Sequence, residues 1–273
     1  MKGKLKIWPG LMGPMTSPPQ EWGHKWAVTN VSYLEFKYYS DGKAVADLVP
    51  DIFELEERPV VRVAFMLQGM SPIGRYHEVI FYIACKYKGK TYEYEPYLYV
   101  NQEAALIAGG EPIGRPKLLA EVHFDPLAEQ NTPLVTATLA RPSNIPLAYG
   151  VFRPNGYVGR VEDMPEQGDP GIACVSIKNI PGHEPLVDFC ACKMVVQKGD
   201  IWSGVGSIAY TGYSGIDELH KMPVVEMIGS KMILNGVSSS DPASAEAFSV
   251  LEDILPAEYI EAYKRAKEGE SND

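Results

Sequence analysis

The stretch VIFYIACKYKGKTYEYEPYLYV, residues 79–100, decides the fold of this chain. Residues 79–87 and 91–100 are rich in β-branched and aromatic side chains, a composition typical of strands, and the intervening Lys88-Gly89-Lys90 favours a hairpin turn. Further strands are predicted at residues 60–68, 121–124, 132–140, 187–197, 201–210 and 224–228. Such a succession of neighbouring strands predicts an α+β chain that is predominantly antiparallel β, folded as a sheet or a closed barrel.

Few helices are expected around these strands. Asp41 can cap a short helix that ends before Pro50, and Asn101 can cap a second helix that ends at Gly109-Gly110 and leads into the segment with Lys117. A third helical pattern begins at Asp241-Pro242 and covers residues 241–268. The first 28 residues have no clear periodicity and are expected to form an irregular arm. We find no linker, so residues 1–273 are predicted to form a single domain.

Composition excludes several classes of function. The net charge of −10 argues against a nucleic-acid partner, because phosphate binding needs a basic face. No run of apolar residues is long enough for a membrane span, and no secretory signal is recognised, so a cytoplasmic protein with reduced cysteines is expected. The five histidines are scattered without ligand spacing, and no metal site is predicted.

Lys117 is the candidate nucleophile. It follows Pro116 and precedes two leucines, a setting that predicts a fixed and partly dehydrated amine. A free lysine has a pKa near ~10.4, so a lysine must be perturbed before its neutral amine can attack a ketone and form an iminium. Read alone, the same string also fits a surface lysine after a turn.

The surrounding motifs resemble those of the acetoacetate decarboxylase family over roughly residues 31–235. The active-site signature of that family is similar to residues 110–117, GEPIGRPK, and places Lys117 at the Schiff-base lysine. An upstream element, residues 74–78, GRYHE, places Glu78 at an active-site carboxylate. Weaker matches are FRPN at 152–155, WSG at 202–204, and MPVVE at 222–226 before GSK at 229–231.

Three positions depart from the family pattern. Leu118 stands where many members carry a second lysine, a neighbouring cation that activates the nucleophilic lysine in that family. Val31 aligns with an arginine that can engage the substrate carboxylate, and Ala64 aligns with a second acidic position. The amine chemistry therefore looks retained, whereas recognition of the carboxylate looks altered.

The resemblance implies a cone-shaped or closed β-barrel, a large homo-oligomer, and a lyase that cleaves a C–C bond of a keto acid or ketone without a metal or organic cofactor. Glu78 is expected to move the proton at the enamine carbon. Tyr76 and Tyr97 are expected to line the substrate cavity. An aldolase-dehydratase that uses the same iminium, and a non-catalytic barrel that binds a small ligand, remain the alternatives.

Two polar residues in the signature have open roles. Arg115 lies two positions before Lys117, and in an extended segment both side chains point to the same side. It can lower the pKa of Lys117, hold a substrate carboxylate, or form a surface salt bridge. Glu111 can cap or orient the loop that carries the lysine.

Overall fold

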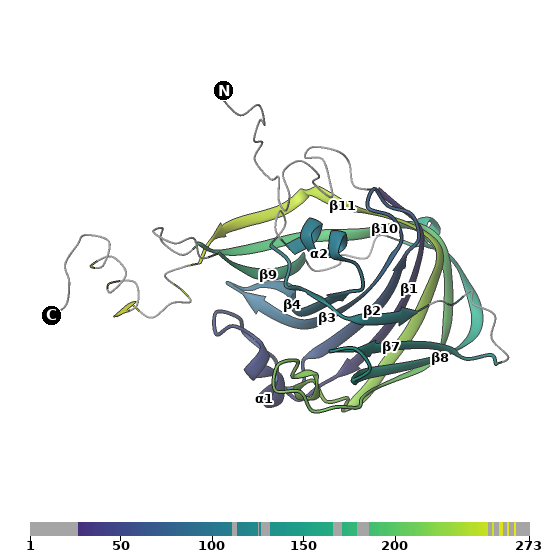
Figure 1. The fold of residues 1–273 in the computed structure, drawn as a ribbon, viewed down its shortest axis with the longest axis horizontal. Helices are drawn as coiled ribbons and strands as arrows, with labels where there is room; N and C mark the ends of the chain where they lie inside the picture. The colour runs from purple at the N-terminus through teal and green to yellow at the C-terminus, as the bar shows by residue number, and fades with distance from the viewer. Residues whose placement is uncertain are drawn as a thin grey trace, which may run out of the picture.

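The structure is a computed structural model that describes residues 27–110, 114–124, 126, 132–165, 171–178 and 186–250, together with residues 253, 257, 258, 261 and 265. Strands dominate it, and the helices in the described part of the chain are short (Figure 1). No helix in those ranges is long and apolar enough to cross a membrane. The strands are β1 (Ala27–Tyr39), β2 (Val60–Gln68), β3 (Tyr76–Tyr87), β4 (Lys90–Val100), β5 (Lys117–Leu119), β6 (Glu121–Phe124), β7 (Val135–Ala140), β8 (Pro146–Arg160), β9 (Gly171–Lys178), β10 (Leu186–Tyr210) and β11 (Glu226–Ser249). The helices are α1 (Gly42–Val45) and α2 (Glu103–Gly110), with 3-10 turns η1 (Ala46–Leu48), η2 (Val161–Asp163) and η3 (Leu219–Lys221).

All of these strands belong to one curved sheet (Figure 1). The hydrogen-bonded order is β11-β1-β2-β3-β4-β9-β10-β8-β7-β6, with β5 paired beside β4. Pairing is antiparallel except where β4 meets β5 and β9. The predominantly antiparallel fold class with few helices is thus confirmed. Within the described residues the end strands of this order, β11 and β6, are not paired with each other, whereas β11 pairs a second time, with β10.

The hairpin between β3 and β4 forms as the sequence predicts. Tyr87 pairs with Lys90 across a two-residue turn, in which Lys88 has φ 48° and Gly89 has φ 78°. Positive φ at both central residues gives the turn a twist that matches the twist of the flanking strands. The capping prediction for α1 is also confirmed, because the Asp41 side chain accepts hydrogen bonds from Lys43 N–H and Ala44 N–H.

The sheet is buried on both faces along its central strands. Successive residues of a strand point to opposite faces, and on β3 Val79 and Phe81 enter one core cluster while Ile80 and Tyr82 enter another. We call these the Phe81 face and the Ile80 face. Burial on both sides explains why these strands read as nearly continuous apolar runs. The Ile80 face also carries Tyr33, Ala64, Met66, Tyr76, Leu98 and Val100.

Two boundary predictions were wrong. The helical segment predicted from residue 241 does not begin there, because β11 continues to Ser249 and pairs it with Asp188 of β10. Cross-strand pairing overrides the weak local preference of these residues for a helix. Ala27 and Val28, expected in the irregular arm, belong to β1, while residues 1–26 and most residues after 250 lie outside the described ranges.

Candidate active site

The loop that delivers Lys117 is folded tightly against the end of α2. Gly114 N–H donates to Gly110 O at 3.0 Å, and Arg115 N–H donates to Gly109 O at 3.1 Å. Gly114 has φ +75°, a conformation that glycine adopts without strain. The chain then enters β5, where Lys117 pairs with Leu98 of β4. Backbone bonds on both sides therefore fix the position of the lysine.

The side chain of Lys117 lies over the C-terminal end of α2. A β-carbon added to Gly109 would fall 2.1 Å from Lys117 Cε and 2.8 Å from Nζ. The side chain of Lys117 is only 9% exposed. Residue 109 therefore has to be glycine for the lysine to occupy this place, and the predicted fixed and partly dehydrated amine is what the structure contains.

Glu78 faces this lysine from β3. Glu78 Oε2 lies 3.4 Å from Lys117 Nζ, and the Glu78 side chain is 3% exposed. Its other oxygen, Oε1, accepts a hydrogen bond from Gln68 Nε2 at 2.6 Å. Gln68 is brought there by register, because Met66 of β2 pairs with Glu78 and Gln68 pairs with Tyr76. The carboxylate is thus held between an amide and an amine.

Tyr76 lies beside the same pair. Its ring centroid is 6.0 Å from Lys117 Nζ, at the outer limit of a cation–π contact. Burial, with a smaller contribution from Glu78, raises the pKa of the Tyr76 phenol well above its usual value. The phenol therefore stays neutral near Lys117. The structure brings together Lys117, Glu78 and Tyr76 as the sequence analysis expected.

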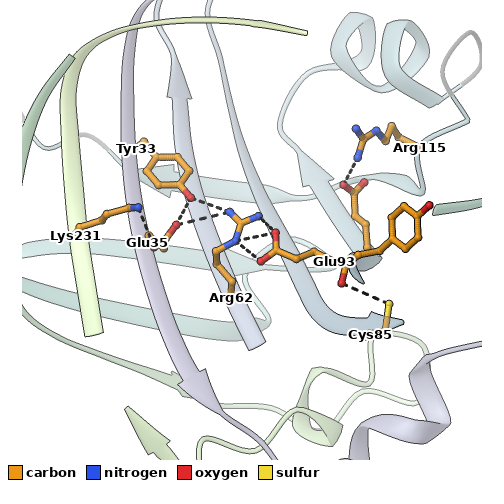
Figure 2. Close-up of polar contacts among 9 residues, drawn as sticks. Tyr33, Glu35, Arg62, Cys85, Glu93, Arg115 and Lys231 are labelled. Atoms are coloured by element: carbon orange, nitrogen blue, oxygen red, sulfur yellow. Dashed lines mark hydrogen bonds and ion pairs between the residues drawn. The ribbon is translucent and has the colours of Figure 1, made fainter. Parts of the chain in front are cut away.

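Arg115 is buried rather than exposed, and it already has a partner (Figure 2). Its Nη1 donates to Glu95 Oε2 at 2.5 Å, and its Nη2 donates to Cys192 Sγ at 2.7 Å. Burial raises the pKa of Glu95, although Arg115 and then Lys117 act to lower it. The surface salt bridge considered for Arg115 is therefore wrong, since the pair is internal, and the positive charge is largely compensated by Glu95.

Two expected site residues are not placed beside Lys117. Tyr97 packs against the cluster on the Phe81 face, where its ring stacks on Tyr99 at 5.9 Å and its hydroxyl accepts from Glu218 N–H at 3.2 Å. The reason is the alternation of β4, which sends Tyr97 and Tyr99 to the side opposite Leu98. Glu111 lies outside the described residues.

A second polar group, which was not predicted from the sequence, lies on the Ile80 face (Figure 2). Arg62 donates to Glu93 through two nitrogens and to the Tyr33 hydroxyl at 2.9 Å, and it lies 3.7 Å from Glu35. Lys231 contacts Glu35 from β11 at 3.5 Å. Arg62 stands among valines in an alternating strand, and such a buried cation requires acidic partners. A lone arginine among the valines of a predicted strand was therefore the sequence feature that could have indicated this group.

Two of the three departures from the family pattern, Val31 and Ala64, lie in this region. Val31 and Ala64 are fully buried and belong to the cluster on the Ile80 face. Ala64 pairs across the sheet with Glu35. The positions where the family pattern carries an arginine and an acid are thus apolar here, while the charges nearby are already arranged in pairs.

The chain is similar in sequence to proteins of one known family. Residues 13–254 match the family model described as acetoacetate decarboxylase (ADC). Decarboxylase DEC1 of Cochliobolus heterostrophus is 33% identical over 222 residues, which cover 80% of this chain and 87% of that protein. Acetoacetate decarboxylase of Clostridium botulinum is 24% identical over 249 residues, covering 88% of this chain and 96% of that protein.

Solved structures show the same fold. A structure of acetoacetate decarboxylase superposes with a TM-score of 0.69 at 20% identity, covering 86% of this chain and 93% of that chain. The enduracididine biosynthesis enzyme MppR, complexed with the condensation product of pyruvate and imidazole 4-carboxaldehyde, superposes with a TM-score of 0.68 at 15% identity, covering 91% and 98%. At these identities the likeness is one of fold.

The fold and the family match define an acetoacetate decarboxylase-like lyase, a decarboxylase or a related enzyme. The chain belongs to the acetoacetate decarboxylase family, as the motifs around residues 78 and 117 indicated.

Proposed function

We propose that the protein is a lyase that cleaves a C–C bond of a keto acid through a Schiff base on Lys117. The observation that carries this proposal is the 3.4 Å contact between Lys117 Nζ and Glu78 Oε2 inside a protected site. A buried amine beside a carboxylate can pass its proton to that carboxylate and then act as a nucleophile. The position of both residues in motifs that resemble the family signature supports the same roles.

The reaction begins when Nζ adds to the ketone carbon and water leaves, which forms an iminium. The bond between the α-carbon and the carboxylate then breaks, its electron pair moves into the enamine, and CO2 departs. Glu78 delivers a proton to the enamine carbon, and hydrolysis of the new iminium releases the ketone and frees Lys117. Glu78 is suited to this step because Gln68 holds one oxygen while the other faces Nζ.

An aldolase-dehydratase that uses the same enamine is the second candidate. The observation that favours it is the pairing of Arg115 with Glu95, together with the apolar residues Val31 and Ala64. A decarboxylase has to hold the carboxylate of its substrate, and these positions offer it little. Acetoacetate is therefore expected to be a poor substrate, and a larger keto acid or an added aldehyde is expected to do better.

Parallel assays of purified protein test the proposal. Release of CO2 from acetoacetate and from larger keto acids is measured beside aldehyde-dependent condensation of pyruvate. Lys117→Ala is expected to abolish every activity. The matched control is Lys86→Ala, which removes an exposed lysine paired with Glu56 and is expected to leave turnover unchanged. Full turnover by Lys117→Ala would refute the mechanism, and binding of keto acids without any turnover would favour a non-catalytic binding protein.

The proposal also covers the oligomeric state of the protein and its cellular compartment. We infer a homo-oligomer and a cytoplasmic protein from the resemblance to the family and from the sequence. Light scattering on the purified protein gives the mass of the assembly, and a monomer at micromolar concentration would contradict the first inference.

A further inference from the structure

A buried acceptor beside Glu78 has no donor. Gln68 is 1% exposed, and its Nε2 donates to Glu78 Oε1 at 2.6 Å. Its other amide atom, Oε1, is buried and has no hydrogen-bond partner among the described residues. The orientation of the amide is set by Glu78, because the carboxylate oxygen accepts from Nε2 and so directs the carbonyl oxygen of Gln68 away from it. Gln68 is thus fixed with its carbonyl oxygen unpaired.

The positive groups around this side of the sheet are already paired. Arg115 donates to Glu95, and Arg62 donates to Glu93. In the described part of this region, two buried atoms without a hydrogen-bond partner are both acceptors, Oε1 of Gln68 and Oε1 of Glu95. A surplus of acceptors favours a ligand that brings hydrogen-bond donors.

We propose that this enzyme prefers a carbonyl substrate that carries a hydroxyl group, a hydroxyketone or a hydroxylated keto acid, and that Gln68 Oε1 accepts the hydrogen bond from that hydroxyl. This inference rests on the lysine chemistry proposed above. An unpaired buried acceptor costs about 1–3 kcal/mol. A substrate hydroxyl that pairs with it recovers this energy, whereas an analogue without the hydroxyl leaves the acceptor unpaired. Gln68 is then both the positioning residue for Glu78 and the residue that determines specificity.

The test compares two ketones that differ by one hydroxyl, acetone and hydroxyacetone. The rate at which cyanoborohydride traps each ketone on the protein is measured at low ketone concentration, and the hydroxyacetone-to-acetone ratio is taken. Dividing the ratio of the wild-type protein by that of Gln68→Met cancels the different intrinsic reactivities of the ketones. The expected quotient lies between about 5 and about 150, which is the energy of an unpaired buried acceptor expressed as a fold-change.

Gln102→Met is the matched control. Gln102 also has a buried Oε1 without a partner, but its Nε2 donates to the Ile73 backbone carbonyl at 2.8 Å rather than to Glu78. The same substitution there is expected to leave the ratio of trapping rates within about twofold of wild type, because the Gln102 amide is bonded to the Ile73 backbone and not to Glu78. A hydroxyacetone-to-acetone ratio that falls equally in both variants would show a general loss of packing and would overturn the assignment to Gln68.

The outcomes separate this inference from the function on which it rests. A wild-type protein that traps neither ketone at Lys117 contradicts the lysine mechanism itself. A wild-type protein that traps both ketones, with the same ratio in Gln68→Met, overturns only the specificity proposal. If circular dichroism shows that Gln68→Met does not fold, the wild-type ratio is compared with that of a free lysine ester under the same conditions. A wild-type ratio no higher than that of the ester also overturns the proposal.

Discussion

Gly109 and Lys117 are packed so closely that any side chain at position 109 would displace the lysine: an added β-carbon would lie 2.1 Å from Lys117 Cε. The two residues belong to different elements, the end of α2 and the start of β5. The helix end therefore determines where the lysine side chain runs. The geometry of the candidate nucleophile depends on this contact as much as on Glu78.

Gly109→Ala is expected to displace the lysine and to lower kcat by about 100-fold, because a misplacement of about 1 Å can cost that much. The control is Gly110→Ala, where the new β-carbon would meet only Arg115 O at 3.7 Å, an ordinary contact. Steady-state kinetics on both variants gives the comparison. Equal activity of the two variants would show that the position of Lys117 does not depend on Gly109.

Glu78→Gln keeps the size of the side chain and removes the base. Loss of a positioned general acid–base lowers rates by about 100-fold to 10,000-fold. We expect kcat to fall within that range. The decisive measurement is deuterium incorporation into the product from D2O. An unchanged rate and isotope pattern would remove Glu78 from the proton transfer.

Arg115 and Glu95 are expected to be strongly coupled in stability. Their side chains are 6% and 0% exposed, and removing one partner of a buried ion pair costs about 3–5 kcal/mol. Arg115→Met and Glu95→Gln should each destabilise the fold by that order, and the double variant should lose much less than the sum. Urea unfolding of the wild-type protein, the two single variants and the double variant measures the coupling energy between Arg115 and Glu95. Additive losses would show that the pair does not interact.

Glu35 should make the protein sensitive to acid. Burial alone would raise its pKa, but Lys231 and Arg62 lower the pKa of this carboxyl below its usual value. A carboxyl with a depressed pKa in the folded state stabilises the fold above the unfolded pKa, near 4.5, and loses this contribution as the pH falls through the folded pKa. Between pH 7 and acidic pH, Glu35→Gln should therefore lose less of its free energy of unfolding than wild type.

Glu95 should act in the opposite direction. Burial raises the pKa of Glu95, so protonation of this group as the pH falls towards the unfolded value favours the folded state. Urea unfolding of Glu35→Gln and Glu95→Gln at several pH values measures both slopes. Relative to wild type, the two substitutions should change the pH dependence of the free energy of unfolding in opposite directions, and changes of the same sign would contradict this account of the two buried carboxyls.

The parts of the structure predicted from sequence are those that local chemistry determines. The hairpin at Lys88-Gly89 requires positive φ at its two turn positions, and the strand composition on either side of it is unambiguous. Lys117 and Glu78 were found because their motifs resemble those of a known family. Each of these features depends on residues that are close together in the sequence.

The features that sequence reasoning missed depend on pairing between distant strands. Gln68 reaches Glu78 only because β2 and β3 pair in one register, and Arg115 reaches Glu95 from a loop outside β4. Tyr97 faces away from Lys117 for the same kind of reason. The last part of β11 is a strand because β10 lies beside it, although its local sequence favours a helix. Register and pairing of this kind are not encoded in short motifs.

The central claim is that Lys117 forms the iminium, and peptide mass spectrometry after reductive trapping tests it most directly. The protein is incubated with a keto acid, reduced with borohydride, digested and mapped, with Lys117→Ala and Lys86→Ala treated in parallel. The account predicts one covalent adduct, on the peptide that contains Lys117, in the wild-type protein and in Lys86→Ala, and none in Lys117→Ala. An adduct that persists in Lys117→Ala, or its absence from a wild-type protein that turns over the same keto acid, would contradict the account.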